Sequence, residues 1–391
     1  MSLPSTLDLD ARVKVLRIIA RMNVGGPAVQ ITSLMRGLDP LKFNHKLITG
    51  YCENTESDYL DSAATDIIVE RVKGLGRSIN LFSDLLCVYQ IIKIIRDFKP
   101  DIIHTHTAKA GVIGRIASVL SGQKSKRIHT FHGHILHGYF SILKTKIYIF
   151  IENILSVFTH KFLCVGSKVR DDLIRVGIGN PDKYLVFPPG VEKPMIFERQ
   201  AAANQLGISA DRFYCLYLGR ITRIKRPDRL IEVGTILRTK NVDVNFLIAG
   251  DGDLFQETQD SAAELDLPFI FLGWQHDVAT LFSVANILVM TSDNEGTPLS
   301  IVQAQLSEVP VVSTNVGSVS EVLLDGISGF LTNLDSNVIA EKIEFLVNNP
   351  KERVEMGVAG LSFAGEKFSP SRLVSDHERL YKELILSPTN F

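Results

Sequence analysis

Short apolar runs rich in β-branched and aromatic residues alternate with helical patterns along most of this chain. In the first half, the runs that read as strands are Val13–Ala20, His45–Thr49, Asp66–Val69, Asp101–His104, Arg127–Thr130, His160–Val165 and Tyr184–Phe187. In the second half they are Phe213–Leu218, Val244–Ala249, Phe269–Leu272, Ile287–Met290, Pro310–Val312 and Gly329–Leu331. Such an alternation predicts parallel sheets of βα units, so the expected fold class is α/β.

The length of the chain, 391 residues, predicts two domains, because one hydrophobic core does not grow to that size. Two prolines and a glycine in Phe187–Val191 end any regular element there and predict a linker. We therefore expect domains over residues 1–190 and 191–370, and a C-terminal helix over 371–391 that packs back on the first domain. Doubly wound domains bind ligands at the carboxyl ends of their strands, so two that face each other predict a ligand cleft between them.

Composition excludes several classes of protein. The cysteines lie far apart without a C-x-x-C pair, which argues against disulfides and a zinc site and favours a cytoplasmic location; they are Cys52, Cys87, Cys164 and Cys215. Residues 1–10 carry two aspartates and no apolar core, unlike a signal peptide. The most membrane-like stretch, 135–165, is interrupted by charged side chains and is not expected to span a bilayer.

Charge is divided unevenly between the halves. By Lys and Arg against Asp and Glu, residues 1–190 carry +9 and residues 191–391 carry −10. A basic half suggests contact with an anionic surface or ligand, and the alternative is attraction between two faces of a cleft. No nucleic-acid motif accompanies the basic residues, so no nucleic-acid partner is expected.

One segment of the second half predicts a phosphate site. Thr297 can cap a helix that follows the strand Ile287–Met290, and Pro298 suits the first helical position. The free N–H groups of Thr297, Leu299 and Ser300 would then point at a ligand in front of the helix. Such a helix end carries partial positive charge and tends to hold phosphate.

Groups beside this helix start suit a sugar. Glu295, followed by Gly296, is an acceptor that repels phosphate and fits sugar hydroxyls, and Gln303 projects from the same helix face two turns later. Gly219-Arg220 and Lys225, on the loop after the domain's first strand, offer cations to phosphate, or else form a solvated basic loop. This combination predicts a site for a phosphorylated sugar.

Two glycine turns carry weaker signals. Gly25-Gly26, with Pro27 starting a helix, forms either a plain tight turn or a loop facing a ligand. The chain has no G-x-G-x-x-G there, which argues against a dinucleotide dehydrogenase. Trp274, in the Leu272-Gly273-Trp274 turn, could line a pocket for a base.

Polar side chains also follow two strands of the first half. His106 and Lys109 lie at a switch from strand to helix, where a ligand could meet them, although His106 taken alone reads as structural. His132, followed by glycine and His134, ends the next strand. These histidines lack a carboxylate or cysteine at ligand spacing, so a metal is not expected, and His132 is the first candidate for a polar catalytic contact.

Together these motifs resemble the family 4, or group 1, glycosyltransferases, whose GT-B architecture is two tandem Rossmann-like doubly wound domains facing across a cleft. The resemblance spans nearly the whole chain and rests on Gly25-Gly26, Phe131-His132-Gly133, Gly219-Arg220 with Lys225, Glu295-Gly296-Thr297-Pro298, Val309–Val312, Glu321–Gly326 and Ser328-Gly329-Phe330. Residues Thr105–Arg115 and His129–His134 look like a subgroup that builds bacterial surface polysaccharides and lipopolysaccharides.

The resemblance implies metal-independent transfer of a sugar from a nucleotide-sugar donor, by family habit a UDP-sugar, with retention of configuration. It implies that Arg220 and Lys225 neutralise the donor diphosphate and that Glu295 holds a sugar hydroxyl. The Thr297–Ser300 amides would help to bind phosphate, and His132 would contact the donor sugar or departing phosphate.

The first domain would hold the acceptor, a saccharide or lipid-linked saccharide. The Gly25-Gly26 turn would face phosphates and acceptor, and His106, Lys109 and His134 are the further acceptor-side candidates. The segment Phe140–Phe162 offers aromatic and basic residues for contact with the inner face of the cell membrane.

Two residues depart from the family pattern. Gln303 stands where a second glutamate usually accepts hydrogen bonds from ribose, and Glu308 stands where glycine usually precedes the next strand. The change at Gln303 leaves open a degenerate transferase that acts as a binding or regulatory module. A nucleotide-sugar 2-epimerase on the same architecture is a further alternative, but it needs carboxylates for elimination and re-addition.

Overall fold

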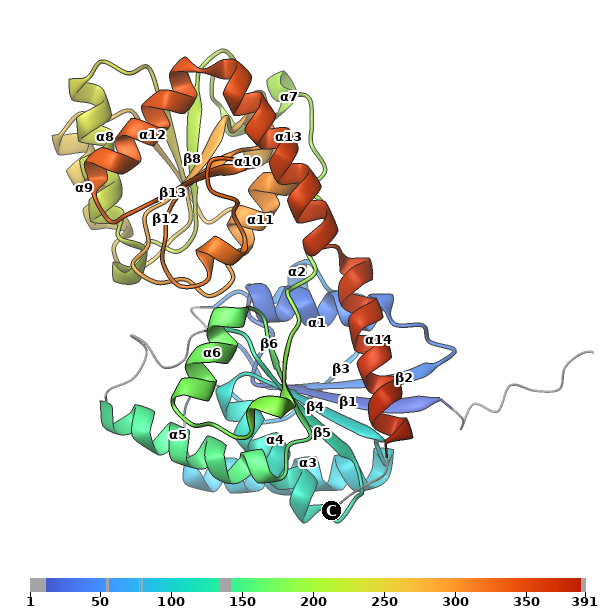
Figure 1. Ribbon diagram of the computed structural model, residues 1–391. Coiled ribbons are helices and arrows are strands. Elements are labelled where there is room, and N and C mark those ends of the chain that lie inside the picture. The colour runs from blue at the N-terminus through green and yellow to red at the C-terminus, as the bar shows by residue number, and fades with distance from the viewer. Residues whose placement is uncertain (1–11, 54–55, 77, 79, 134–141, 388–391) are drawn as a thin grey trace, which may run out of the picture. The chain divides into compact units, whose positions relative to one another are not determined.

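The computed structural model describes residues 12–53, 56–76, 78, 80–133 and 142–387. The chain divides into two compact units (Figure 1). The first contains Met1–Gly190 and Pro370–Phe391, and the second is Val191–Ser369. The final helix therefore belongs to the first unit, and it begins one residue before the expected boundary.

In the described part of the first unit, seven strands form one parallel sheet in the order β3-β2-β1-β4-β5-β6-β7. The strands are β1 Val13–Ile19, β2 Phe43–Thr49, β3 Val69–Arg71, β4 Ile102–His106, β5 Lys126–Phe131, β6 Lys161–Cys164 and β7 Tyr184–Val186. The strand order reverses between β1 and β4, and the loops that leave two such neighbours diverge and make room for a ligand. Only β3 lies clearly off its predicted position, which was Asp66–Val69.

Helices cover both faces of this sheet. They are α1 Gly26–Gly37, α2 Tyr59–Ser62, α3 Leu81–Phe98, α4 Ala108–Leu120, α5 Ile142–Val157, α6 Ser167–Arg175, the 3-10 turn Pro181–Lys183 and α14 Pro370–Leu386. Leu34 of α1 and Leu373 and Tyr381 of α14 share one core with Ile102 and Ile128 of the sheet. On the other face, Ile91 of α3 and Ile113 of α4 pack with Leu16 and Ile18 of β1 and Ile103 of β4. The last helix thus completes the core of the first unit.

The second unit has a parallel sheet of six strands among its described residues, in the order β10-β9-β8-β11-β12-β13. The strands are β8 Tyr214–Leu218, β9 Asn245–Ala249, β10 Phe269–Gly273, β11 Ile287–Met290, β12 Val311–Thr314 and β13 Gly329–Thr332. The helices are α7 Arg199–Leu206, α8 Pro227–Thr239, α9 Phe255–Glu264, α10 Val278–Val284, α11 Leu299–Leu306, α12 Ser336–Asn348 and α13 Pro350–Lys367, with 3-10 turns at Arg223–Lys225 and Val319–Glu321. The order reverses between β8 and β11.

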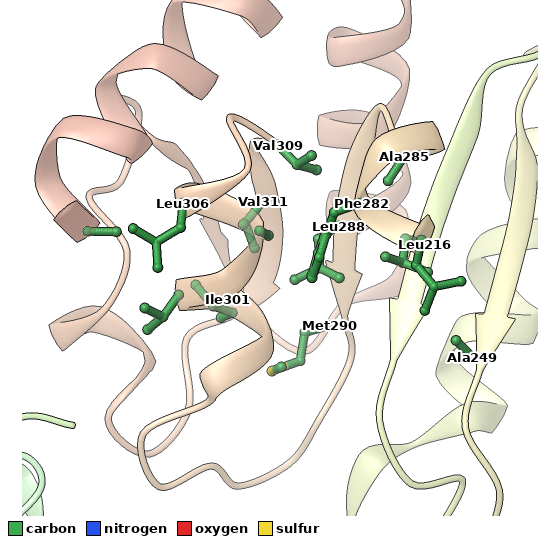
Figure 2. Close-up of a cluster of buried hydrophobic side chains, with 14 of the residues drawn as sticks. Leu216, Ala249, Phe282, Ala285, Leu288, Met290, Ile301, Leu306, Val309 and Val311 are labelled. Atoms are coloured by element: carbon green, nitrogen blue, oxygen red, sulfur yellow. The ribbon is translucent and has the colours of Figure 1, made fainter. Parts of the chain in front are cut away.

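Buried aliphatic side chains fix the switch-point strands of this unit. Leu216 of β8 and Leu288 of β11 pack with Phe282 of α10 and Ile301 of α11 (Figure 2). Strands buried on both faces are apolar nearly throughout, which is why the sequence runs of this half read so clearly as strands. Both units confirm the expected α/β fold class with parallel, doubly wound sheets. Among the described residues, no helix is long and apolar enough to cross a membrane.

Candidate active site

Lys225 and Glu295 form an ion pair at the switch point of the second sheet. The Nζ atom of Lys225, on the loop after β8, donates to Oε1 of Glu295, on the loop after β11, at 2.5 Å. The hydroxyl of Ser292 donates to the same oxygen at 2.6 Å. Glu295 is 8% exposed. Two residues that the sequence analysis assigned to one site, 70 positions apart, are thus in direct contact.

A network of arginines and aspartates joins the two loops that carry this pair. Arg229, at the start of α8, donates to the carbonyl oxygen of Thr291 at 2.5 Å and to Asp293 at 2.8 Å. Arg226 also pairs with Asp293, at 3.1 Å. Hydrogen bonds from Arg226 to Asp228 lower the pKa of that carboxyl. Because the loops are cross-linked at several points, the Lys225–Glu295 pair is held in place before any ligand arrives.

A third loop supports Glu295 from the end of β12. The N–H of Ser318 donates to the carbonyl oxygen of Glu295 at 3.1 Å. Gly317 has φ of 54°, and a Cβ atom there would lie 1.7 Å from the same oxygen. Only glycine fits this position, both for its backbone conformation and for its space.

Arg220 differs from the other cations of the site. Its side chain is exposed, and within the described residues its guanidinium has no ion pair or hydrogen bond. Its carbonyl oxygen accepts from the hydroxyl of Tyr217 at 3.0 Å, which ties its backbone to β8. A tethered but unpaired guanidinium is available to an anion.

The helix start at α11 differs from the prediction by one residue. Pro298, not Thr297, occupies the capping position: its carbonyl oxygen accepts from Ile301 at 3.2 Å, and α11 begins at Leu299. The expectations of a Thr297 cap and of Pro298 as first helical residue are therefore wrong. The N–H groups of Leu299 and Ser300 belong to the first turn, where a helix provides no partner. The predicted helix-end donors remain at these two positions.

Gly296 and Thr297 join Glu295 to this helix, and Gln303 lies half-buried on α11. The last turn of α11 forms a hydrogen-bonded C-terminal motif in which Val309 donates to Ala304 and Glu308 donates to Gln305. Glu308 occupies the left-handed position of that motif, with φ of 59°. Glycine is the usual residue there, and this explains physically why Glu308 stands out in the sequence.

Backbone contacts align the ends of β8, β9 and β10. Gly219 donates to Ala249 at 3.0 Å and Gly250 donates to Gly273 at 2.8 Å. A Cβ atom on Gly250 would lie 1.9 Å from the carbonyl oxygen of Gly219, so these strands end in close contact. Trp274 is 41% exposed and directly follows Gly273, the last residue of the edge strand β10, which is two strands away from β8.

In the first unit, two of the predicted residues are in contact. Nδ1 of His106, at the end of β4, lies 3.0 Å from Nε2 of His132, which follows β5. His106 is completely buried and His132 half-buried. Burial lowers the pKa of His106 well below its usual value and lowers that of His132 to about 3. Both rings are therefore neutral at pH 7.

The other first-unit candidates have varied surroundings. Gly25 precedes the first residue of α1, Gly26, on the loop after β1, so this turn shares the switch point with His106. The Nζ atom of Lys109 donates to the carbonyl oxygens of Gly74 and Ser78 and pairs with Asp84 at 2.8 Å. Lys109 thus fastens the segment before α3. His134 lies outside the described residues.

A chain of hydrogen bonds links β1, α14 and β4 on the sheet face that α14 covers. Arg17 donates to the hydroxyl of Tyr381 at 3.1 Å, and that hydroxyl lies 2.7 Å from Nδ1 of His104. Guanidinium only donates, so the Tyr381 oxygen accepts from Arg17. The Nε2 atom of His104 lies 2.7 Å from the Thr130 hydroxyl, so both ring nitrogens have a hydrogen-bond partner. His104 stacks on His106 with ring centroids 4.2 Å apart.

The residues that hold the loops of the site in place were not predicted from the sequence. Asp293 and Arg229 were not singled out, although an acid after β11 and a base at the start of α8 are complementary in charge. Gly317 had no motif to mark it. Among the described residues, no cluster of three or more histidine, cysteine or acidic side chains is arranged to hold a metal ion.

Comparison with protein families decides the assignment. Residues 198–362 match the family described as "Glycosyl transferases group 1", and residues 24–193 match "Glycosyltransferase Family 4". The chain belongs to the group 1 glycosyltransferases. It is therefore an enzyme of glycosyl transfer, as the motifs predicted.

Individual relatives agree with this family. The chain is 27% identical over 307 residues to an Escherichia coli UDP-Gal:alpha-D-GlcNAc-diphosphoundecaprenol alpha-1,3-galactosyltransferase, covering 76% of this chain and 78% of that protein. It is 28% identical to the Staphylococcus aureus capsular polysaccharide biosynthesis glycosyltransferase CapM, covering 84% and 89%. In fold it is similar to Anabaena Alr3699/HepE in complex with UDP, with a TM-score of 0.80, 19% identity, and coverage of 95% and 100%. This group 1 glycosyltransferase thus has the GT-B fold.

Proposed function

We propose that this group 1 glycosyltransferase moves a sugar from a UDP-sugar to a saccharide or lipid-linked saccharide, with retention of configuration, in the assembly of a bacterial surface polysaccharide or lipopolysaccharide. The relatives named for capsule synthesis and for a diphosphoundecaprenol acceptor support the acceptor class. The structural neighbour in complex with UDP supports the base.

The observation that carries this proposal is the prepared polar site at the switch point of the second unit. Breaking the bond between the anomeric carbon and the diphosphate leaves negative charge on the departing nucleotide. Arg220, Lys225 and the Leu299 and Ser300 amides provide fixed donors for that charge, which is electrostatic preorganisation. Glu295, aligned by Lys225, accepts from a hydroxyl of the sugar.

The other second-unit residues bind the nucleotide. The Gly219 turn, with its neighbours at β9 and β10, lets the backbone approach the ligand closely, and Trp274 borders the base. Gln303 accepts from a ribose hydroxyl through its amide oxygen in place of the glutamate usual in the family. Arg220, Lys225 and the Leu299 and Ser300 amides carry the charge of the diphosphate, and we propose that no metal is required.

The first unit provides the acceptor side of the reaction. The Gly25-Gly26 turn and the end of β4 share its switch point, where ligands bind in open α/β sheets. His132 provides a neutral polar contact to the sugar that is transferred. His106, Lys109 and His134 are the further residues that the sequence pattern places on the acceptor side.

The first unit also has a surface suited to a membrane. Helix α4 packs between α3 and α5 on one sheet face, as Figure 1 shows. Exposed apolar side chains follow one another on the outer sides of these helices: Leu81, Phe82, Leu85, Leu86 and Tyr89 on α3, Val119 and Leu120 on α4, and Leu143, Ile147, Phe150, Ile154 and Val157 on α5. We name this set the α3–α5 face.

Charge indicates what covers the α3–α5 face. Lys144 and Lys146 are exposed among the apolar residues of α5, whose one acid, Glu152, is buried against Arg115. An apolar surface with lysines at its side fits the interface of an anionic bilayer. We propose that the enzyme is cytoplasmic and binds the inner membrane face peripherally, where a lipid-linked acceptor lies.

Nucleotide binding tests the transfer proposal. Thermal shift and calorimetry with UDP, GDP and ADP in EDTA, followed by the sugar forms of the nucleotide that binds, should show tight binding of UDP without metal. Arg220→Ala should lower turnover by ~10²–10³, the usual loss for one donor of this kind. Arg223→Ala removes the same charge three residues away and is the matched control. Failure of every nucleotide to bind the folded protein would favour the non-catalytic module.

Liposome flotation tests the membrane proposal. Binding to vesicles with anionic lipid should exceed binding to neutral vesicles, weaken with salt, and fall in Phe150→Ser. Val354→Ser, which changes an equally exposed apolar residue of the second unit, should bind as the unaltered protein does. Binding that ignored lipid charge, salt and Phe150 would refute the assignment of the α3–α5 face.

A further inference from the structure

The contact between His106 and His132 restricts where their hydrogens lie. The Nδ1 atom of His106 and the Nε2 atom of His132 are 3.0 Å apart, so one hydrogen lies between them. Burial keeps both rings neutral at pH 7, so each ring carries a single N–H. Two arrangements remain, which differ in the ring that donates.

The remaining nitrogen of His106 distinguishes the two arrangements. Its Nε2 atom is buried and has no hydrogen-bond partner among the residues that the structure describes. If His132 donated, the single hydrogen of His106 would lie on Nε2, as a buried N–H without an acceptor. If His106 donates from Nδ1, Nε2 holds only a lone pair. Buried N–H groups without partners are rarer in proteins than under-satisfied acceptors, so the second arrangement is favoured.

We infer that His106 is a positioning residue, which donates from Nδ1 to Nε2 of His132 and thereby holds His132 in the tautomer with its hydrogen on Nδ1. Within the described residues, the ring of His132 has one hydrogen-bond partner, Nδ1 of His106, so its own Nδ1 atom has none. It therefore faces its ligand as a fixed, neutral N–H donor. This inference rests on the proposed role of His132 at the transferred sugar.

The surroundings of His106 hold its ring in this orientation. Its face is stacked on His104, which the Tyr381 hydroxyl and Thr130 fix on both nitrogens. Thr107, which follows His106 in the chain, has φ of 65° and ψ of 159°, a conformation that is unfavourable for a β-branched side chain. Its carbonyl oxygen accepts from Gly111 at 2.8 Å. A strained residue persists only where its surroundings determine it, and this one ends the strand that presents His106.

The consequence is a division of roles. His132 contributes a hydrogen bond to an oxygen of the sugar and takes no proton from the acceptor, because its Nε2 lone pair is occupied by His106. This hydrogen bond orients the transferred sugar for departure of the diphosphate, and its effect on the rate arises from that positioning. His106 contacts no ligand, and its effect reaches the sugar only through His132.

Nuclear magnetic resonance tests the tautomer without any activity assay. In protein labelled with ¹⁵N-histidine, long-range ¹H–¹⁵N correlations at pH 7.5 distinguish a ring protonated on Nδ1 from one protonated on Nε2. His132→Gln assigns the His132 signals by their loss. We expect His132 to carry its hydrogen on Nδ1 in the unaltered protein. A hydrogen on Nε2 of His132 would overturn the inference even if the enzyme were active.

Matched variants of His106 test the mechanism. His106→Leu removes the donor and should return His132 to a mixture of tautomers or to the Nε2–H form. His106→Asn retains an N–H near the position of Nδ1 and should preserve the tautomer. His129, whose Nδ1 lies 2.9 Å from the Thr105 hydroxyl, serves as an unaffected internal reference. An unchanged His132 tautomer in folded His106→Leu would refute the role of His106.

Kinetics then separate this inference from the proposed function. With the nucleotide sugar identified, His106→Leu should lower kcat about tenfold, the scale of one hydrogen bond, with little change in KM for the donor, and His106→Asn should restore much of it. The expected tautomers without turnover of any nucleotide sugar would count against the proposed function and not against the hydrogen-bond assignment. Equal kcat in His106→Leu and the unaltered enzyme would refute the positioning role.

Discussion

Acid should unfold the first unit before the second. Four of its histidines are completely buried: His104, His106, His129 and His377. Burial lowers the pKa of each, in the last case to about 3. In the unfolded chain these rings titrate near the ordinary value of about 6.5, so below that pH the unfolded state binds protons that the folded state rejects. Stability is therefore full above about pH 7 and is lost as the pH falls.

The size of the effect follows from linkage. A histidine that stays neutral in the fold loses about 1.4 kcal/mol of stabilisation between pH 7.5 and 5.5, so these four lose about 5 kcal/mol. Burial also lowers the pKa of His45 and His132 to about 3 and that of His160 to about 4, which adds to the loss. That is a large part of the stability of an ordinary domain, about 5–15 kcal/mol. The second unit has one histidine, His276, and that residue is exposed. The stability of the second unit should therefore change far less between pH 7.5 and 5.5.

Urea denaturation at the two pH values measures both units in one sample. The chain has one tryptophan, Trp274, so its fluorescence reports the second unit, while far-ultraviolet circular dichroism reports both. The dichroism transition that has no fluorescence counterpart should move to much lower urea at pH 5.5. His377→Gln removes one buried ring and should reduce the loss of stability between the two pH values by about 1.4 kcal/mol. Equal movement of both transitions, or none, would refute the reasoning.

Three further predictions concern single residues. Glu308→Gly should stabilise the second unit by about 0.5–1 kcal/mol in urea denaturation. Glycine adopts the left-handed backbone conformation of this position without strain, at some cost in the entropy of the unfolded chain. A loss of stability would show that the Glu308 side chain makes compensating contacts. Arg115 donates to both carboxylate oxygens of Glu152, at 2.7 and 2.8 Å. Glu152→Gln should destabilise the first unit by about 3–5 kcal/mol, because it leaves the buried Arg115 guanidinium without its counter-charge. A urea midpoint within error of that of the unaltered protein would contradict this. Gly317→Ala should weaken binding of the nucleotide sugar in calorimetry, since the added methyl group displaces the backbone of Glu295, and unchanged affinity would mean that this loop yields without moving the site.

The strands could be predicted from the sequence because their burial makes them apolar throughout and turn residues bound them. β3 is the exception: it has three residues at a sheet edge, and little hydrophobic signal separates it from its flanks. The start of α11 was predicted within one residue. Proline fits both the capping position and the first helical position, so local propensity alone does not distinguish them.

The candidate site was predictable in its membership but not in its connections. Residue type and position after strands selected Arg220, Lys225 and Glu295. The Lys225–Glu295 ion pair depends on which strands are neighbours in the sheet. Lys109 shows the opposite case, because its position suggested a ligand while its amine reaches carbonyl oxygens about 30 residues earlier, a contact that no local pattern records.

The place of α14 has a consequence for synthesis on the ribosome. All residues of the second unit are contiguous in the chain, so it can finish folding as soon as Ser369 has emerged. The first unit begins earlier but lacks Leu373, Leu380 and Tyr381, which fill one side of its core, until the last helix is made. Until α14 has been synthesised, that sheet face of the first unit therefore stays uncovered and accessible to chaperones or to other chains.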